Sequence, residues 1–372
     1  MHLAFCSDTA SFSQDQLRNQ QWSSKFPGAG WITCLYDLAD ESGIQVASGD
    51  VAIGKIKSNK WRVDDVYVIQ EMQSVEATKL LNMGAKAFLI TCAEAPLYAP
   101  FFFDHICRLS KSFQFTMGFG FSLARCGNLA IKKDLPFRFP SYFLSDIQEI
   151  TKWQDRKKIV LVAANKYKTQ KLCIPDLPSA INLMRQIKAL TWRLISPSYR
   201  KSLEASLHDK RLEMVEYFSK NGELALYGAG WDKWDTHPSA VVCRLKNSVK
   251  KQYLGLCQNK HETISRYKFS ICFENMALAG YVTEKIVDCF VAGTIPLYWG
   301  APDISSIVPE QAFVDLRKFS SLVQLDAYLN SMSEEQALAI IGAGRSYLQS
   351  EAGMLHCYET FARNVITVAK TC

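Results

Sequence analysis

The chain has 372 residues, of which 48% are hydrophobic and 21% are charged, and its formal net charge is +7. This length is sufficient for two domains with separate cores, and the composition is that of a globular protein. No basic stripe with interleaved aromatic residues is present, so the sequence does not indicate nucleic-acid binding. It also contains no apolar run of 18 residues, so no transmembrane helix is expected.

The first 150 residues alternate between strand and helix patterns. Short β-prone runs predict strands at residues 3–6, 31–36, 66–69 and 87–91. The segment 73–83 predicts a helix that ends at Gly84, with apolar residues spaced for burial from Val75 onward. Strands that alternate with helices favour an α/β layer.

One carboxylate follows directly after a predicted strand in this half. Glu94 comes after the strand predicted at 87–91, and open parallel sheets bind their ligands outside the carboxyl ends of their strands. A glutamate that caps a helix or lies in a surface loop would show the same local pattern. The position of Glu94 therefore leaves a binding role and a structural role open.

The polar stretch 141–157 is interpreted as an interdomain connection, and the apolar run 158–163 as the first strand of a second α/β domain. Apolar residues at helical spacing from 203 to 218 then predict a helix before a strand at 224–227. Arg211 lies on the apolar stripe of this helix, or in the first turn of a shorter helix that Asp209 caps. A guanidinium in either place invites an anionic partner, and a structural salt bridge explains the pattern equally well.

The most informative stretch is 267–302. It predicts a strand, a helix from Thr283 to Gly293 and a second strand, which together form a parallel βαβ unit. Lys285 lies in the first turn of the helix, where the helix dipole disfavours a cation by roughly a few tenths of a kcal/mol. Backbone N–H groups and an ammonium group at one helix start form a phosphate site. Glu284 beside it could accept hydrogen bonds from sugar or ribose hydroxyls. The alternative is a solvated Glu–Lys pair on a surface helix.

The end of the chain is predicted to be largely helical. The pattern indicates a strand at 312–315, a helix at 322–332, a helix at 334–341 with Ser333 as N-cap, and a final helix within 354–368. The twelve cysteines are scattered without a CxxC pair and without zinc-ligand spacing. We therefore expect free, mostly buried thiols in a reducing cytosol.

The runs FEN, GYVTEKIVD and GTIPLYWGAP, in this order within residues 273–302, closely resemble the donor-site signature of the α1,3/4-fucosyltransferases, family 10 of the glycosyltransferases. The resemblance implies the GT-B architecture, in which two Rossmann-like α/β domains face each other across a cleft. It places an acceptor-binding domain at 1–150 and a GDP-fucose-binding domain at 151–345. A C-terminal helix within 346–372 is expected to pack back on the first domain.

By this resemblance, the protein transfers L-fucose from GDP-fucose to a hydroxyl of a glycan acceptor, with inversion at the anomeric carbon. The usual acceptor of the family is N-acetylglucosamine in a lactosamine-like glycan, linked α1,3. Glu94 matches a Glu-x-Pro-type element of the family and is the expected general base. Arg211, Lys285 and the helix start at Thr283 are expected to stabilise the departing diphosphate. The residues expected to contact the nucleotide or the fucose hydroxyls are Asn275, Tyr281 and Glu284.

The resemblance implies no required metal, although Mn²⁺ or Mg²⁺ could stimulate transfer. The lack of an N-terminal anchor resembles bacterial members of the family and leads us to expect lipopolysaccharide or surface-glycan synthesis in the cytoplasm. The positive charge would favour peripheral contact with the inner membrane face. Two alternatives remain: a GT-B enzyme that uses another nucleotide sugar, and a non-catalytic module that binds nucleotide sugars or glycans. The oligomeric state is open.

Overall fold

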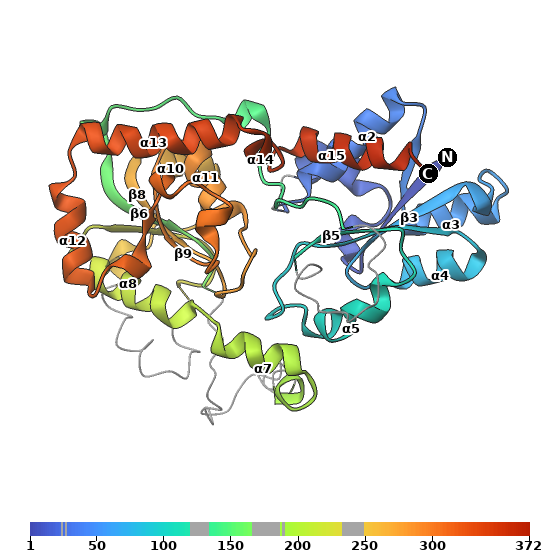
Figure 1. Cartoon of the computed structure of the whole chain (residues 1–372), viewed down its shortest axis with the longest axis horizontal. Coiled ribbons are helices and arrows are strands. Elements are labelled where there is room, and N and C mark those ends of the chain that lie inside the picture. The colour runs from blue at the N-terminus through green and yellow to red at the C-terminus, as the bar shows by residue number, and fades with distance from the viewer. Residues whose placement is uncertain (24, 27, 120–133, 166–186, 188–189, 233–248) are drawn as a thin grey trace. The chain divides into compact units, whose positions relative to one another are not determined.

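The computed structural model describes residues 1–23, 25–26, 28–119, 134–165, 187, 190–232 and 249–372. The chain divides into two compact units, which are shown in Figure 1. Unit 1 comprises residues 1–145 and 351–372, and unit 2 comprises residues 146–350. Each unit contains a five-stranded parallel sheet. The α/β class predicted from the sequence is confirmed in both.

The sheet of unit 1 has the strand order β2-β1-β3-β4-β5. Its strands are β1 (His2–Cys6), β2 (Gln45–Ser48), β3 (Val66–Glu71), β4 (Lys86–Cys92) and β5 (Phe115–Gly118). Helices α2 (Gly30–Glu41) and α15 (Tyr358–Ala369) pack on one face. Helices α3 (Gly49–Lys57), α4 (Val75–Met83) and α5 (Pro100–Ser110) pack on the other (Figure 1). Short helices α1 (Gln20–Ser23) and α14 (Glu351–Met354) complete the unit. Successive residues of a strand point to opposite faces, so Leu3 lies in one core and Ala4 in the other.

The strand predicted at 31–36 is wrong, because these residues belong to helix α2. All residues from 30 to 36 are buried, since α2 packs against both the sheet and α15. A continuous apolar run has no polar face, so periodicity cannot distinguish a buried helix from a strand. Close packing also depends on Gly30, where an added Cβ would lie 2.6 Å from Cε2 of Tyr358.

The helix predicted at 73–83 is confirmed as α4. The side chain of Ser74 accepts a hydrogen bond from the N–H of Ala77, and Gly84 ends the helix with φ of 108°. The expected burial of Val75 is wrong, because its side chain is 56% exposed. Val75 is the first residue of the helix and precedes the turn in which Ala77 and Leu80 face the core.

Unit 2 has the strand order β10-β9-β8-β6-β7. Its strands are β6 (Lys157–Val162), β7 (Leu224–Tyr227), β8 (Tyr267–Phe273), β9 (Ile295–Trp299) and β10 (Val314–Asp315). Numbered within each unit, both sheets have the order 2-1-3-4-5 of a common doubly wound fold. The βαβ unit predicted at 267–302 is confirmed, since β8 and β9 pair in parallel and are joined through α11 (Glu284–Ala292).

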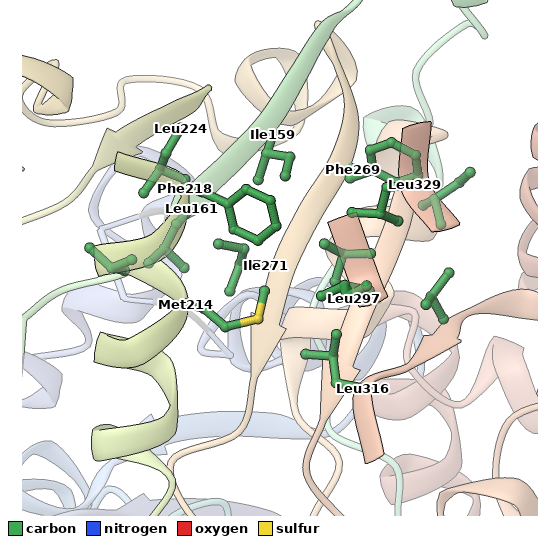
Figure 2. Close-up of a cluster of buried hydrophobic side chains, with 14 of the residues drawn as sticks. Ile159, Leu161, Met214, Phe218, Leu224, Phe269, Ile271, Leu297, Leu316 and Leu329 are labelled. Carbon is green, nitrogen blue, oxygen red and sulfur yellow. The ribbon is translucent and has the colours of Figure 1, made fainter. Parts of the chain in front are cut away.

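Helices cover both faces of this second sheet. Helices α8 (His208–Lys220) and α12 (Leu322–Ser331) pack on one face, where Met214 and Phe218 meet Leu161 and Ile271 (Figure 2). Helices α10 (Lys260–Ser265) and α11 supply Ile264 and Ala292 to the other face. Helix α7 (Pro197–Glu204) precedes α8, and α13 (Glu334–Gln349) contacts α11.

Helix α13 extends eight residues beyond its predicted end at Ile341, to Gln349. Its N-terminus is as predicted: Ser333 is the N-cap and forms a capping box with Gln336. The prediction ended the helix before two glycines, each of which costs about 1 kcal/mol in a helix interior. Packing outweighs that cost, because a Cβ at Gly344 would lie only 2.5 Å from Cδ1 of Phe290 in α11.

Two further features bear on the sequence analysis. Eight cysteines of the described residues are free, whereas Cys107 is disulfide-bonded, so the expectation of free thiols is wrong at Cys107. Within the described ranges, no helix is both long enough and apolar enough to cross a membrane.

Candidate functional site

In sheets with this strand order, ligands bind outside the carboxyl ends of the strands, where the order reverses between the first and third strands. In unit 2 this position lies between β6 and β8. The segment 274–283 leaves β8 there and leads into α11. It contains or adjoins five of the residues predicted to bind the donor: Asn275, Tyr281, Thr283, Glu284 and Lys285.

The start of α8 is tied to this segment by backbone hydrogen bonds. The N–H of Leu207 donates to the carbonyl of Asn275 (3.1 Å), and the N–H of Ala277 donates to the carbonyl of Ala205 (2.7 Å). Helix α7 ends at Glu204 and α8 begins at His208, with Leu207 as N-cap, so the predicted helix from residue 203 is interrupted and the alternative cap at Asp209 is wrong. Arg211 lies one turn inside the helix and is 5% exposed. The structure therefore brings the helix of Arg211 and the loop of Asn275 together.

Glu274 lies at the centre of the contacts around the start of α11. It is fully buried, and its Oε1 accepts a hydrogen bond from the N–H of Thr283 (2.8 Å). Its Oε2 accepts from Oγ1 of Thr283 (2.7 Å) and from Nζ of Lys285 (3.1 Å). The sequence analysis gave Glu274 no role. Its position directly after a buried strand is the same pattern that identified Glu94, so the available signal was overlooked.

Lys285 is held by three acceptors. Besides Glu274, its Nζ donates to Oγ1 of Thr283 (2.7 Å) and to Oε1 of Glu284 (3.2 Å). The side chains of Lys285 and Glu284 are only 17% and 21% exposed. The two residues are thus not a solvated surface pair. They belong to a partly enclosed charge network.

The charges of this network stabilise one another. Burial disfavours the ammonium of Lys285, but the carboxylates of Glu274 and Glu284 outweigh it and hold the pKa of Lys285 well above its usual range. Burial also disfavours the ionised form of Glu284, yet Lys285 and then Lys260 lower its pKa to about 2. Both groups therefore remain charged at neutral pH.

A second ion-pair group lies beside the first. Lys260, the first residue of α10, forms an ion pair with Asp288 of α11, and Nε2 of His261 lies 2.9 Å from Oδ1 of Asp288. Burial lowers the pKa of Lys260, but Asp288 and Glu284 outweigh it, so the net shift is upward. Sequence reasoning missed Lys260 because its contacts come from a different helix.

The remaining predicted donor residues lie on the same segment. Tyr281 and Thr283 are each 2% exposed, Asn275 is half-buried, and Thr283 is the N-cap of α11. The turn before them is held by Asp303, whose Oδ1 accepts from the N–H of Gly280 (2.9 Å). Within the parts of the chain that the structure describes, no three His, Cys, Asp or Glu side chains are grouped to hold a metal ion.

Glu94 lies in unit 1, just beyond the carboxyl end of β4, and its side chain is exposed. One charged group that interacts with Glu94 is Glu71, the last residue of β3, which pairs with Thr91 of β4. Burial raises the pKa of Glu71, and the charge of Glu94 raises it further, against a hydrogen bond with Ser7 that lowers it. Sequence reasoning missed Glu71 because it ends a strand that was predicted to stop at residue 69.

Two parallel α/β units with helices on both faces of each sheet have the architecture of the GT-B fold. The chain is similar over its whole length to a glycosyltransferase from Rickettsia africae ESF-5, with a TM-score of 0.58, 10% identity and 98% of that structure covered. This likeness shows the fold.

Residues 203–339 match the family model described as glycosyltransferase family 10 (fucosyltransferase) C-term. This match agrees with the family that the motif in 273–302 resembles. The chain is also 42% identical over 72 residues to the alpha-(1,3)-fucosyltransferase FucT of Helicobacter pylori, a match that covers 19% of this chain and 15% of that protein. It is 36% identical over 75 residues to an alpha-(1,4)-fucosyltransferase of Arabidopsis thaliana, covering 20% of this chain and 19% of that protein. The matches thus span less than a fifth of these relatives' length.

Proposed function

We propose that the protein is an inverting fucosyltransferase that moves L-fucose from GDP-fucose to a hydroxyl of a glycan acceptor. The proposed acceptor is N-acetylglucosamine, linked α1,3, in a lactosamine-like or lipopolysaccharide glycan. The observation that carries the proposal is the charge network of Glu274, Glu284 and Lys285. It lies at the ligand-binding edge of the sheet and within the region that matches family 10.

Unit 2 would bind the donor. The start of α11 provides backbone N–H groups, and Lys285 provides an ammonium held within 3.2 Å of its neighbours. Arg211 on the adjoining helix would add a guanidinium, which suits a diphosphate because its donors are arranged as a planar fork. Glu284, charged at neutral pH, would accept hydrogen bonds from sugar hydroxyls. Asn275 and Tyr281 would orient the nucleotide or the fucose.

Unit 1 would provide the base. In the proposed step, Glu94 accepts the proton of the acceptor hydroxyl as its oxygen forms a bond to the anomeric carbon. The bond from that carbon to the diphosphate breaks, and GDP leaves with the bonding electron pair. Negative charge that develops on the leaving group would be stabilised by Arg211, Lys285 and the start of α11 at Thr283.

The direct test is incubation with GDP-fucose and a panel of lactosamine-type acceptors, with GDP release and glycan mass as readouts. We expect GDP release that requires the acceptor, and one added deoxyhexose per glycan. GDP-mannose and UDP-sugars serve as competing donors. Transfer of another sugar would replace GDP-fucose as the donor, and guanine-nucleotide binding without turnover on any acceptor would favour a non-catalytic module.

A further inference from the structure

Glu274 is the most completely enclosed charged group of the donor region. It is fully buried, and its own N–H donates to the carbonyl of Trp299 on β9 (2.9 Å). A buried carboxylate is costly unless hydrogen bonds and an opposite charge compensate it. Both are supplied by Thr283 and Lys285, nine and eleven residues further along the chain.

We propose that Glu274 is the positioning residue of the donor site. Its carboxylate orients Thr283 and Lys285 before the nucleotide arrives, so that the start of α11 and the ammonium group are already aligned for a diphosphate. Glu274 would not itself contact the donor. The inference rests on the proposed function, since it assigns the network to GDP-fucose binding.

The geometry requires a carboxylate rather than an amide. One oxygen of Glu274 faces the backbone N–H of Thr283, and the other faces the ammonium of Lys285. Both of these groups are donors only. A glutamine at this position would direct its NH₂ group at one of them in either orientation. Glu274→Gln therefore removes the negative charge. In one of the two contacts it also leaves two hydrogen-bond donors pointing at each other.

The space beside Glu274 is equally restricted. A Cβ at Gly300 would lie 2.5 Å from Cγ of Glu274 and 2.2 Å from Oη of Tyr298. That hydroxyl oxygen accepts a hydrogen bond from the N–H of Ala301 (3.0 Å). The glutamate of FEN, the threonine and lysine of TEK and the glycine of YWG thus form one contact set.

The hydroxyl of Thr283 links Glu274 to Lys285 and offers a test that leaves the buried charges in place. Thr283→Val keeps the shape of the side chain but removes the hydroxyl, and Thr283→Ser restores it. We expect Thr283→Val to weaken GDP binding in calorimetry, and to lower kcat/KM for GDP-fucose, by roughly 10- to 100-fold. Thr283→Ser should remain within about 3-fold of wild type.

A second measurement tests the negative charge of Glu274 through the pH dependence of GDP binding. Lys285 is surrounded by Glu274, Glu284 and Tyr281, by Lys260 of α10 and by Cys272 of β8. Since Glu274 is the largest influence that raises the pKa of Lys285, Glu274→Gln should move the alkaline loss of GDP binding to lower pH. If Glu274 were needed only for folding, Glu274→Gln would lower the midpoint of thermal unfolding but would not change the pH at which GDP binding is lost.

Glu223→Gln is the matched control, because Glu223 also pairs with a lysine of unit 2 (Oε1 to Nζ of Lys158, 2.6 Å) but lies outside the network. Its GDP binding should equal that of wild type. If wild type binds no GDP, the proposed function fails and the inference fails with it. If wild type binds and Thr283→Val binds as tightly, only the inference is overturned. If Glu274→Gln does not fold, the comparison of Thr283→Val with Thr283→Ser still tests the inference.

Discussion

The two units share one sheet topology but place their charges in opposite ways. In each unit the third strand has a glutamate at its carboxyl end: Glu71 is the last residue of β3, and Glu274 directly follows β8. Glu274 is fully buried against a lysine, whereas Glu71 is half-buried and faces a second carboxylate, Glu94. A cation-paired edge suits an anionic donor, and a carboxylate edge suits proton removal from a hydroxyl. Under the proposed function, the same position in the fold would thus serve two chemistries, because the neighbours set the charge.

The loss of Glu94 should have the largest effect on transfer. We expect Glu94→Ala to lower kcat by about 10³-fold, since a positioned general base typically contributes 10²–10⁴-fold. GDP affinity should stay within about 2-fold, because Glu94 lies in the other unit from the donor network. Initial rates and calorimetry measure the two quantities. If turnover is retained, Glu94 is not the general base. The proposed functional contrast between the carboxyl edges of the two sheets would then fail.

Substitution of a glycine that lies at the end of an edge strand in each sheet should have the next largest effect. Gly118 ends β5 with φ of +145°, and its Cβ would lie 2.3 Å from the carbonyl oxygen of Cys92. Gly228 follows β7 with φ of +126°, and its Cβ would lie 2.2 Å from the carbonyl oxygen of Ala163. Alanine at either position should lower the free energy of unfolding by about 3 kcal/mol, through backbone strain and overlap.

Gly54→Ala is the control, because Gly54 lies in helix α3 with nothing within 4 Å of its added Cβ. This change should be neutral or stabilise by up to about 1 kcal/mol. Urea unfolding of the three variants measures the differences. Equal stability of all three would contradict the close approach of strands at both edges.

Lys285→Ala tests the cation-paired edge. It removes the ammonium and leaves Glu274 buried without that partner, so GDP affinity should fall by about 10²-fold. Lys220→Ala removes the same charge from an exposed site at the end of α8 and should leave affinity unchanged. Calorimetry at constant ionic strength compares them. An unchanged dissociation constant for Lys285→Ala would mean that the network is structural.

Acid should destabilise unit 1 through His356. This residue is fully buried, its Nδ1 lies 2.8 Å from the carbonyl oxygen of Phe139, and burial lowers its pKa to about 4. The unfolded chain binds a proton near pH 6.5, so stability is full above that pH and falls as pH decreases toward 4. At pH 5 the loss should be about 2 kcal/mol.

Comparison with His356→Asn isolates this contribution from the carboxylates that also titrate. Unfolding free energies of both proteins at pH 7 and pH 5 provide the measurement. The decrease on acidification should be smaller in the variant, whatever its stability at pH 7. An identical decrease in both proteins would show that His356 is not the acid-sensitive group.

Glu71→Gln should produce the smallest effect, on the pH profile of transfer. The interaction between Glu71 and Glu94 is mutual, so removal of one negative charge makes the other easier to keep ionised. The acid limb of kcat should therefore move to lower pH, by less than about one unit. Glu76→Gln, in the first turn of α4, is the control with no expected shift. If the acid limb of kcat does not move in Glu71→Gln, Glu71 does not influence the pKa of the general base.

Local sequence patterns determined much of this protein. The strands β1, β3, β4 and β6–β10 were predicted, as was helix α11 with its start at Thr283 and its end at Gly293. These features depend on alternation, apolar runs and capping residues within a few positions of one another. The motif in 273–302 also predicted the family whose model matches residues 203–339.

The tertiary structure alone decided the rest, because the deciding neighbours are distant in the chain. The run at 31–36 is a helix since α15, more than 300 residues later, covers it. Helix α13 continues past its glycines because Phe290 of α11 packs against Gly344. The position of Glu274 after a buried strand is visible in the sequence, but its contacts with Thr283 and Lys285 are decided by the tertiary structure. Periodicity reports which residues are apolar, but burial on all sides and the pairing of charges depend on which segments meet in space.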